Sequence, residues 1–176
     1  MRTFVVTATL VLLLGACNGD DDSTGASPDE LAAQEATAAS TTTMKSPDGL
    51  VSVDLPQGWT QSEDELAETV AIAAQGEDPL DQVVVTTFGS LEAAQQQAES
   101  TTAGLASDDI ACERVELDDK PAFDCPEDVD GETVRRVLVA LGGDGAGAVL
   151  LVQTPATTFD EAAELAGPIA GSLSFG

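Results

Sequence analysis

Four short apolar segments in the second half of the chain constrain its fold more than any other feature. They cover residues 110–117, 122–125, 132–141 and 146–154. Short turns join them, with Asp130-Gly131 and Gly142-Gly143-Asp144-Gly145 the clearest. Turns of this kind connect neighbouring antiparallel strands. We therefore expect an antiparallel meander.

Three further strands are predicted before the meander, over residues 50–55, 69–74 and 83–88. The first alternates apolar and polar side chains with period two and ends at Pro56-Gln57-Gly58-Trp59. A short helix is expected to begin at Ser62, because Ser62 and Glu65 have capping-box spacing.

Two longer helices are predicted, one before the meander and one after it. Ser90 can cap the first, which extends to Leu105 and has a weakly apolar face that should pack shallowly. Thr158 and Glu161 form a capping box for the second, which Gly167-Pro168 should kink or shorten. This order of elements predicts an α+β domain in which helices sandwich an antiparallel sheet.

The first 16 residues have the organisation of a secretory signal peptide. A positive start at Arg2 precedes a mostly apolar stretch over residues 4–14, and small residues come before Cys17. The tetrapeptide Leu14-Gly15-Ala16-Cys17 resembles the lipobox of bacterial lipoproteins. That resemblance implies that Cys17 receives a diacylglycerol and becomes the mature N-terminus. An ordinary signal peptide with an incidental cysteine is the alternative.

Residues 17–44 are predicted to be the lipidated N-terminus and a disordered acidic tether. After Cys17 they hold six acidic residues, no basic residue and one leucine, which is too little apolar surface to offset the entropy of ordering. Asp20-Asp21-Asp22 is better interpreted as part of a solvated spacer than as a calcium site, because the carboxylates lack a preorganised backbone. The single folded domain is expected over residues 45–176.

The formal net charge of −26 excludes several partners and reactions. Nucleic acid is not expected, because phosphate binding needs clustered lysine and arginine, and an anionic membrane surface would repel the domain. Residues 45–176 hold 26 of the 32 acidic side chains, so the charge belongs mainly to the folded domain. The chain has no histidine, which excludes catalysis by imidazole.

Cys112 and Cys125 are expected to form a disulfide, because disulfides persist outside the cytoplasm. If Asp118-Asp119 is a two-residue turn, Leu117 faces Lys120 and the two cysteines lie directly opposite each other. They then occupy a non-hydrogen-bonded pair, whose close Cα atoms suit a disulfide. Two buried free thiols are the alternative.

The search for a catalytic, metal or cofactor motif gives none. Residues 128–132 begin like a calcium loop, but Pro126 and Val137 stand where the EF-hand pattern needs acids. The glycine-rich segment 142–147 joins two strands and opens no helix, so it is not a phosphate-binding loop. Paired carboxylates of the kind that hydrolyse glycosides remain open in so acidic a chain.

Arg135, Arg136 and Trp59 are the remaining candidates for a binding site. The two arginines should point to opposite faces of one strand, and one of them has the chemistry to bind an anion. Pairing with neighbouring acids is the favoured interpretation for the arginines, and a place in the core is the favoured one for Trp59. The sequence leaves the ligand-binding residues open.

The stretch from Asp48 to Trp59 resembles the opening of actinobacterial lipoproteins of the LpqN/LpqT type, and of the wider PsbP-like fold shared with Ran-binding Mog proteins. In those proteins an early strand ends in Pro-x-Gly-Trp, as residues 56–59 do here. The resemblance continues through an alanine-rich middle helix, a valine-rich strand at residues 147–154 and a closing helix. It implies a helix–sheet–helix sandwich with a binding or scaffolding role in the envelope, and offers no catalytic residue.

These observations predict a monomeric, non-enzymatic binding module without a cofactor, held on the extracytoplasmic face of the cell membrane by its diacylglycerol anchor. Its partner would be an envelope protein or a hydrophobic small molecule. The alternatives are an accessory subunit of a membrane complex and a carboxylate-based hydrolase. A deep apolar cavity favours a small ligand, an exposed apolar patch favours the accessory role, and two converging carboxyl groups favour the hydrolase.

Overall fold

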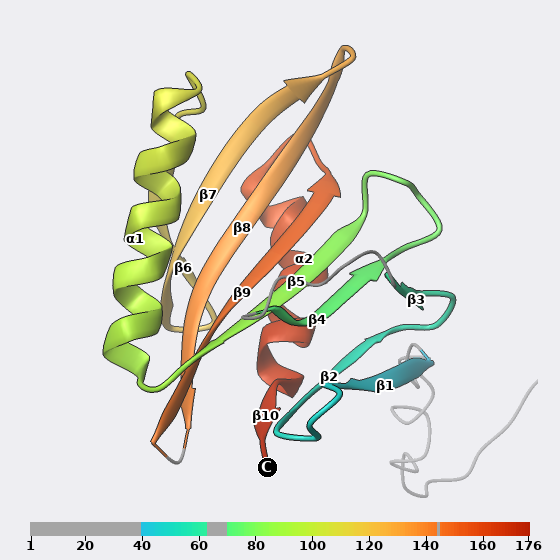
Figure 1. Ribbon diagram of the computed structural model, residues 1–176. Helices are drawn as coiled ribbons and strands as arrows, with labels where there is room; N and C mark the ends of the chain where they lie inside the picture. Colours follow the sequence, from blue (N-terminus) through green and yellow to red (C-terminus); the bar gives the residue numbers. More distant parts are fainter. Residues whose placement is uncertain (1–39, 63–69, 144) are drawn as a thin grey trace, which may run out of the picture. The chain divides into compact units, whose positions relative to one another are not determined.

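A seven-stranded sheet forms the centre of the structure, a computed structural model that describes residues 40–62, 70–143 and 145–176. Every strand in it is antiparallel to its neighbours. The order across the sheet is β3 (Thr60–Gln61), β4 (Val70–Gln75), β5 (Gln82–Phe88), β9 (Ala146–Pro155), β8 (Glu132–Gly143), β7 (Lys120–Val129) and β6 (Glu113–Leu117) (Figure 1). The predicted meander is therefore confirmed as β6 to β9, and β9 continues the sheet by pairing with β5.

The turn between β6 and β7 has the predicted register. Asp118 and Asp119 have φ values of 49° and 62°, and two positive values in succession are typical of a type I′ hairpin turn. Leu117 pairs with Lys120, and the pairing continues in step to Glu113 and Asp124. The turn thus sets the alignment of the whole hairpin.

A second sheet has three strands, with β2 (Val51–Pro56) between β1 (Thr41–Lys45) and β10 (Ser174–Phe175). β1 begins before the predicted domain boundary at residue 45, so the described fold includes residues that were assigned to the tether. Its three threonines give no apolar alternation, yet its backbone pairs with β2 and Met44 packs against the core. Residues 1–39, with the predicted signal peptide and most of the tether, lie outside the described residues, as do residues 63–69 of the predicted short helix.

The two helices cover opposite faces of the large sheet (Figure 1). Helix α1 (Leu91–Ser107) begins at the predicted cap, where Ser90 Oγ accepts a hydrogen bond from the backbone N–H of Ala93 over 3.2 Å. It buries only two side chains, Ala94 and Ala98, which pack against Val149. Small side chains at the contact confirm that α1 packs shallowly.

Helix α2 (Phe159–Ser172) has the predicted capping box, formed by Thr158 and Glu161. It continues through Pro168 to Ser172, so of the two expected effects of Gly167-Pro168, a kink or a shortening, the shortening is wrong. The missing N–H of Pro168 leaves the carbonyl of Glu164 without its helical partner. Gly167 leaves room for the β6–β7 turn, because a Cβ at that position would lie 2.9 Å from Asp118 Oδ2.

The main core lies between α2, β2 and one face of the large sheet. Strand β8 shows the alternation that builds it: Val137 and Val139 face α2, whereas Leu138 packs on the other face near α1. The largest fully buried residues of the main core are Val51, Val53, Leu55, Ile72, Val83, Val85, Val137, Val139, Leu150 and Ile169. Antiparallel strands with a helix on each face confirm the predicted α+β class. Among the described residues, no helix is both long enough and apolar enough to cross a membrane.

Candidate functional site

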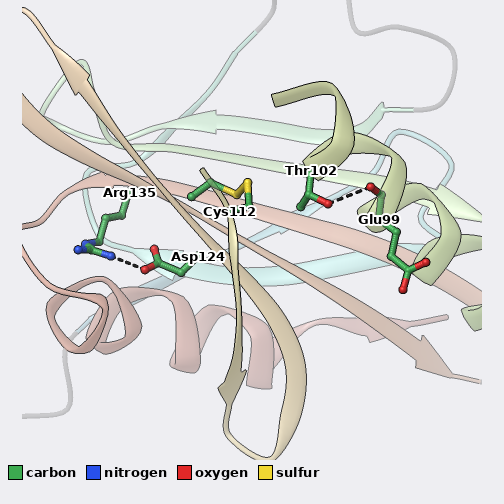
Figure 2. The surroundings of a disulfide bond; sticks show 6 residues. Glu99, Thr102, Cys112, Asp124 and Arg135 are labelled. Atoms are coloured by element: carbon green, nitrogen blue, oxygen red, sulfur yellow. Dashed lines mark hydrogen bonds and ion pairs between the residues drawn. A yellow bond between two sulfur atoms is a disulfide. The ribbon is translucent and has the colours of Figure 1, made fainter. Parts of the chain in front are cut away.

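Cys112 and Cys125 form a disulfide in the structure, with Cα atoms 4.2 Å apart (Figure 2). Cys125 lies in β7 and is fully buried against Ile110 and Leu138. Cys112 belongs to the segment between α1 and β6, so the bond ties that segment to the sheet. This position indicates a structural role and leaves no free thiol for chemistry at these two positions.

Arg135 and Asp124 form an ion pair on the α2 face of the sheet (Figure 2). Only 15% of the Arg135 side chain and 6% of the Asp124 side chain are exposed. Arg135 Nη2 also donates to the backbone carbonyl of Thr157, 2.9 Å away, just before α2. Burial raises the pKa of Asp124 above its usual value even though Arg135 acts to lower it. The pair joins β7, β8 and the start of α2, which indicates a structural role.

Arg136 points to the opposite face, as predicted, and is held there by polar neighbours. Its Nη2 lies 2.6 Å from Glu127 Oε2, and its Nε donates to Gln153 Oε1 over 2.9 Å. The Gln153 amide in turn donates to the carbonyl of Leu80 over 3.1 Å. Both arginines thus pair with neighbouring acids.

Trp59 is 9% exposed and belongs to the main core. Its ring lies against Gly76, where a Cβ would come within 3.1 Å of Trp59 Cε2. The structure therefore supports the interpretation of Trp59 as a core residue.

An apolar cleft of about 360 Å³ lies where the small sheet meets one end of the large sheet. We call it the β10 cleft, because Phe175 of β10 forms one wall. The turn between β1 and β2, the end of β5 and the β8–β9 hairpin supply the other walls. The residues that line the β10 cleft include Asp48, Leu50, Phe88, Gly143, Ala146 and Phe175.

Leu50 is the most exposed large apolar side chain among the described residues, with 57% of its surface accessible. Its backbone is nevertheless fixed, because its N–H donates to Asp48 Oδ1 over 3.0 Å and its carbonyl accepts from the Gly176 N–H over 2.9 Å. Leu50 thus presents an exposed apolar side chain on a hydrogen-bonded backbone beside the β10 cleft.

Asp48 is the single carboxylate side chain among the lining residues of the β10 cleft in the part of the chain that the structure describes. The Ser46 hydroxyl donates to its Oδ1 over 2.5 Å, and the Leu50 N–H donates to the same atom. These two hydrogen bonds, that from Ser46 first, lower the pKa of Asp48 below its usual value. Asp48 is therefore a fixed negative charge beside an apolar cleft at neutral pH.

The glycines of the β8–β9 hairpin allow other elements to approach it closely. A Cβ on Gly143 would lie 2.9 Å from Phe175 Cδ2, and a Cβ on Gly142 would lie 2.8 Å from Leu91 Cβ. A Cβ on Gly147 would collide with the Ser90 carbonyl at the start of α1. The glycine-rich segment therefore shapes the cleft wall, a role that its interpretation as a turn did not include.

A second cleft of about 320 Å³ lies on the other side of Phe175. It shares Gly143 and Phe175 with the β10 cleft and is lined further by Leu141, Leu173 and Lys120. Phe175 therefore lines both clefts. Among the described residues, no group of three or more cysteine and carboxylate side chains is placed to hold a metal ion.

The sequence interpretation missed the β10 cleft. It treated Pro47-Asp48-Gly49 as a turn and Leu50 as the first residue of a strand. No local sequence signal marks the cleft, because Asp48, Phe88 and Phe175 come together only in the folded chain.

Comparison with known proteins finds no matching family model and no match among curated proteins. Solved structures do match. The Ran-binding protein Mog1p of Saccharomyces cerevisiae has a TM-score of 0.54 at 11% identity, over 78% of this chain and 96% of Mog1p. Cyanobacterial PsbP (CyanoP) of Synechocystis has a TM-score of 0.50 at 12% identity, over 78% of this chain and 94% of that protein.

A Bacteroides thetaiotaomicron protein has a TM-score of 0.51 at 16% identity over 76% of this chain, which spans only 48% of that longer protein. LpqN of Mycobacterium tuberculosis, described as involved in cell envelope biogenesis, also matches, over 77% of this chain and 90% of LpqN at 17% identity. Its TM-score of 0.38 is too low to carry an argument. Similarity at these identities shows the fold alone, and the chain has the PsbP/Mog1-like fold.

Proposed function

We propose that this protein is a non-enzymatic interaction module of an actinobacterial cell envelope, anchored to the extracytoplasmic face of the membrane by a diacylglycerol on Cys17. Residues 18–39 then act as a tether between the anchor and the domain. The lipobox-like tetrapeptide Leu14-Gly15-Ala16-Cys17 supports the anchor. The observation that carries the interaction role is the β10 cleft with the exposed Leu50 side chain at its wall.

The chemistry of the β10 cleft favours binding over catalysis. Asp48 is the single carboxylate side chain among the described residues that line it, whereas glycoside hydrolysis uses two carboxyl groups that flank the scissile bond. Leu50 and Phe175 instead offer apolar surface, which contributes to affinity by leaving water. Mog1p, which shares the fold, is itself described as a Ran-binding protein.

The exposure of Leu50 favours a protein partner over a small molecule. A site for a small ligand buries most of the ligand within a preformed cavity. Leu50 instead projects 57% of its surface into solvent, so a partner must surround it from outside. The accessory role in a membrane complex is one form of this interaction.

Site-specific photocrosslinking in intact cells tests the proposal. Benzoylphenylalanine is placed at position 50, beside the cleft, and separately at position 103, on the exposed surface of α1. We expect a discrete crosslinked species from position 50 that is absent from position 103. Equal patterns from both positions would refute the proposed role of the cleft.

A further inference from the structure

The β10 cleft combines two features that constrain what can occupy it. Its walls include the apolar side chains of Leu50, Phe88 and Phe175, and Asp48 places a carboxylate beside them. Its volume of about 360 Å³ is near the lower end of the range of about 300–1,000 Å³ found for ligand pockets. That space suits a few side chains of a partner better than a whole lipid molecule.

Asp48 has no ion-pair partner among the described residues. The ion pairs found there join Arg114 to Glu99, Arg135 to Asp124 and Arg136 to Glu127. These pairs occupy all three arginines of the folded domain. The charge of Asp48 is thus available to a partner, and its position is fixed in advance by Ser46 and the Leu50 N–H.

The negative charge of the whole domain favours a positively charged partner, as the Asp48 carboxylate does. Residues 45–176 carry 26 acidic and five basic side chains, a formal charge of −21. Such a field attracts cations and repels anions over distances set by the ionic strength. A fatty acid or an acidic peptide would approach the cleft against this field, whereas a basic segment would be drawn to it.

We infer that the β10 cleft binds a basic, apolar segment of an envelope protein, which covers Leu50 with apolar side chains and places a lysine or arginine on Asp48. This inference deepens the proposed function and rests on it. The segment would bury the exposed surface of Leu50 against its own apolar residues. Its cation would form an ion pair with the Asp48 carboxylate at the wall of the cleft.

Titration with three labelled peptides tests the inference. The probes are fluorescein-labelled twelve-residue repeats of Leu-Arg, Leu-Glu and Ser-Arg, added to the purified full chain in a non-ionic detergent, with detergent alone as the blank. Fluorescence anisotropy measures binding. We expect the Leu-Arg peptide to bind at least about tenfold more tightly than either other peptide, because it alone supplies both features.

Two matched variants locate the effect. Asp48→Asn keeps the turn, since an asparagine side chain still accepts the Leu50 N–H. Asp78→Asn is the control, because Asp78 Oδ1 accepts from the Leu80 N–H over 2.8 Å in the same local geometry but in the loop between β4 and β5. We expect Asp48→Asn to weaken Leu-Arg binding by about tenfold and Asp78→Asn to leave it within about twofold.

Absent or unselective Leu-Arg binding, or equal effects of the two variants, would overturn the inference. Such a result, together with a specific crosslink from position 50, would leave the proposed interaction role standing and reject only the basic class of partner. Failure of the crosslink would instead reject the proposed role of the cleft itself. The two failures are therefore distinguishable.

Discussion

Gly143 lies directly against the ring of Phe175, so close that a Cβ on Gly143 would stand 2.9 Å from Phe175 Cδ2. The end of β8 and the short strand β10 meet at this point, although 31 residues separate them in the chain. The contact sets the wall of the β10 cleft, because both residues line it. Its geometry leads to a first prediction.

Gly143→Ala is expected to displace Phe175 and to destabilise the domain by about 1 kcal/mol, at the lower end of the cost of overpacking. Gly104→Ala is the control, because Gly104 lies in α1 with open space around it. Alanine there should stabilise the domain by about 0.5–1 kcal/mol, since glycine is unfavourable within a helix. Urea unfolding measures both changes, and a stabilising Gly143→Ala would contradict the role of the contact.

The disulfide is expected to contribute about 2–3 kcal/mol to stability, since it closes a loop with a sequence separation of 13 residues. Replacing Cys112 and Cys125 together by alanine should lower the free energy of unfolding by that amount and leave the peptide selectivity unchanged. Non-reducing mass spectrometry should recover a crosslinked Cys112–Cys125 peptide. Two free thiols would contradict the bond.

The two ion pairs at opposite extremes of burial should differ in their contribution to stability. Asp124→Ala would leave the buried Arg135 without its partner, at an expected cost of about 3–5 kcal/mol. Glu99→Ala removes the partner of Arg114, but those side chains are 60% and 67% exposed, so less than about 1 kcal/mol should be lost. Equal losses in thermal unfolding would contradict this difference.

The capping box of α2 should make stability fall in acid. The Thr157 hydroxyl and the N–H groups of Thr157 and Thr158 donate to Glu161 and hold its pKa below the ordinary value of 4.5. A lowered pKa contributes stability that is complete above the unfolded-state value and is lost as the pH falls through the folded-state value.

Glu161→Gln should therefore be less stable than the wild-type chain at pH 7, and this difference should narrow as the pH falls below about 4.5. Asp160→Gln changes the same charge at the neighbouring exposed position and serves as the control. Urea unfolding at a series of pH values measures the difference. If the difference in the free energy of unfolding between Glu161→Gln and wild type stays constant across that range, ionised Glu161 does not stabilise the capping box.

The anchor makes a separate prediction. Cys17→Ala should abolish labelling of the protein by an alkyne fatty acid and should either release the chain into the medium or leave an unprocessed precursor. The Cys112→Ala, Cys125→Ala double variant should remain labelled. Unchanged labelling of Cys17→Ala would refute lipidation at that residue.

Features encoded by neighbouring residues could be predicted from the sequence. The Asp118-Asp119 turn gave the register of the β6–β7 hairpin, because a two-residue turn leaves one pairing. Both helix caps, at Ser90 and Thr158, were predicted from side chains that bond within one helical turn. Local chemistry determines these features.

Features that depend on distant contacts could not be predicted. Strand β1 has an exposed threonine run with no apolar alternation, and only its pairing with β2 makes it a strand. Helix α2 continues past Pro168 because its packing on the core outweighs one lost hydrogen bond. The β10 cleft could not be predicted either, because Asp48, Phe88 and Phe175 lie far apart in the sequence and meet only in the folded chain.

The role of Leu50 is measured by the affinity of the crosslinked partner for the chain with Leu50→Gln, compared with the chain with Leu91→Gln. Both leucines are exposed, at 57% and 40%, so neither change should unfold the domain. If the β10 cleft is the interaction surface, Leu50→Gln weakens partner binding by about tenfold and Leu91→Gln leaves it nearly unchanged. Equal affinities for the two variants would contradict the account.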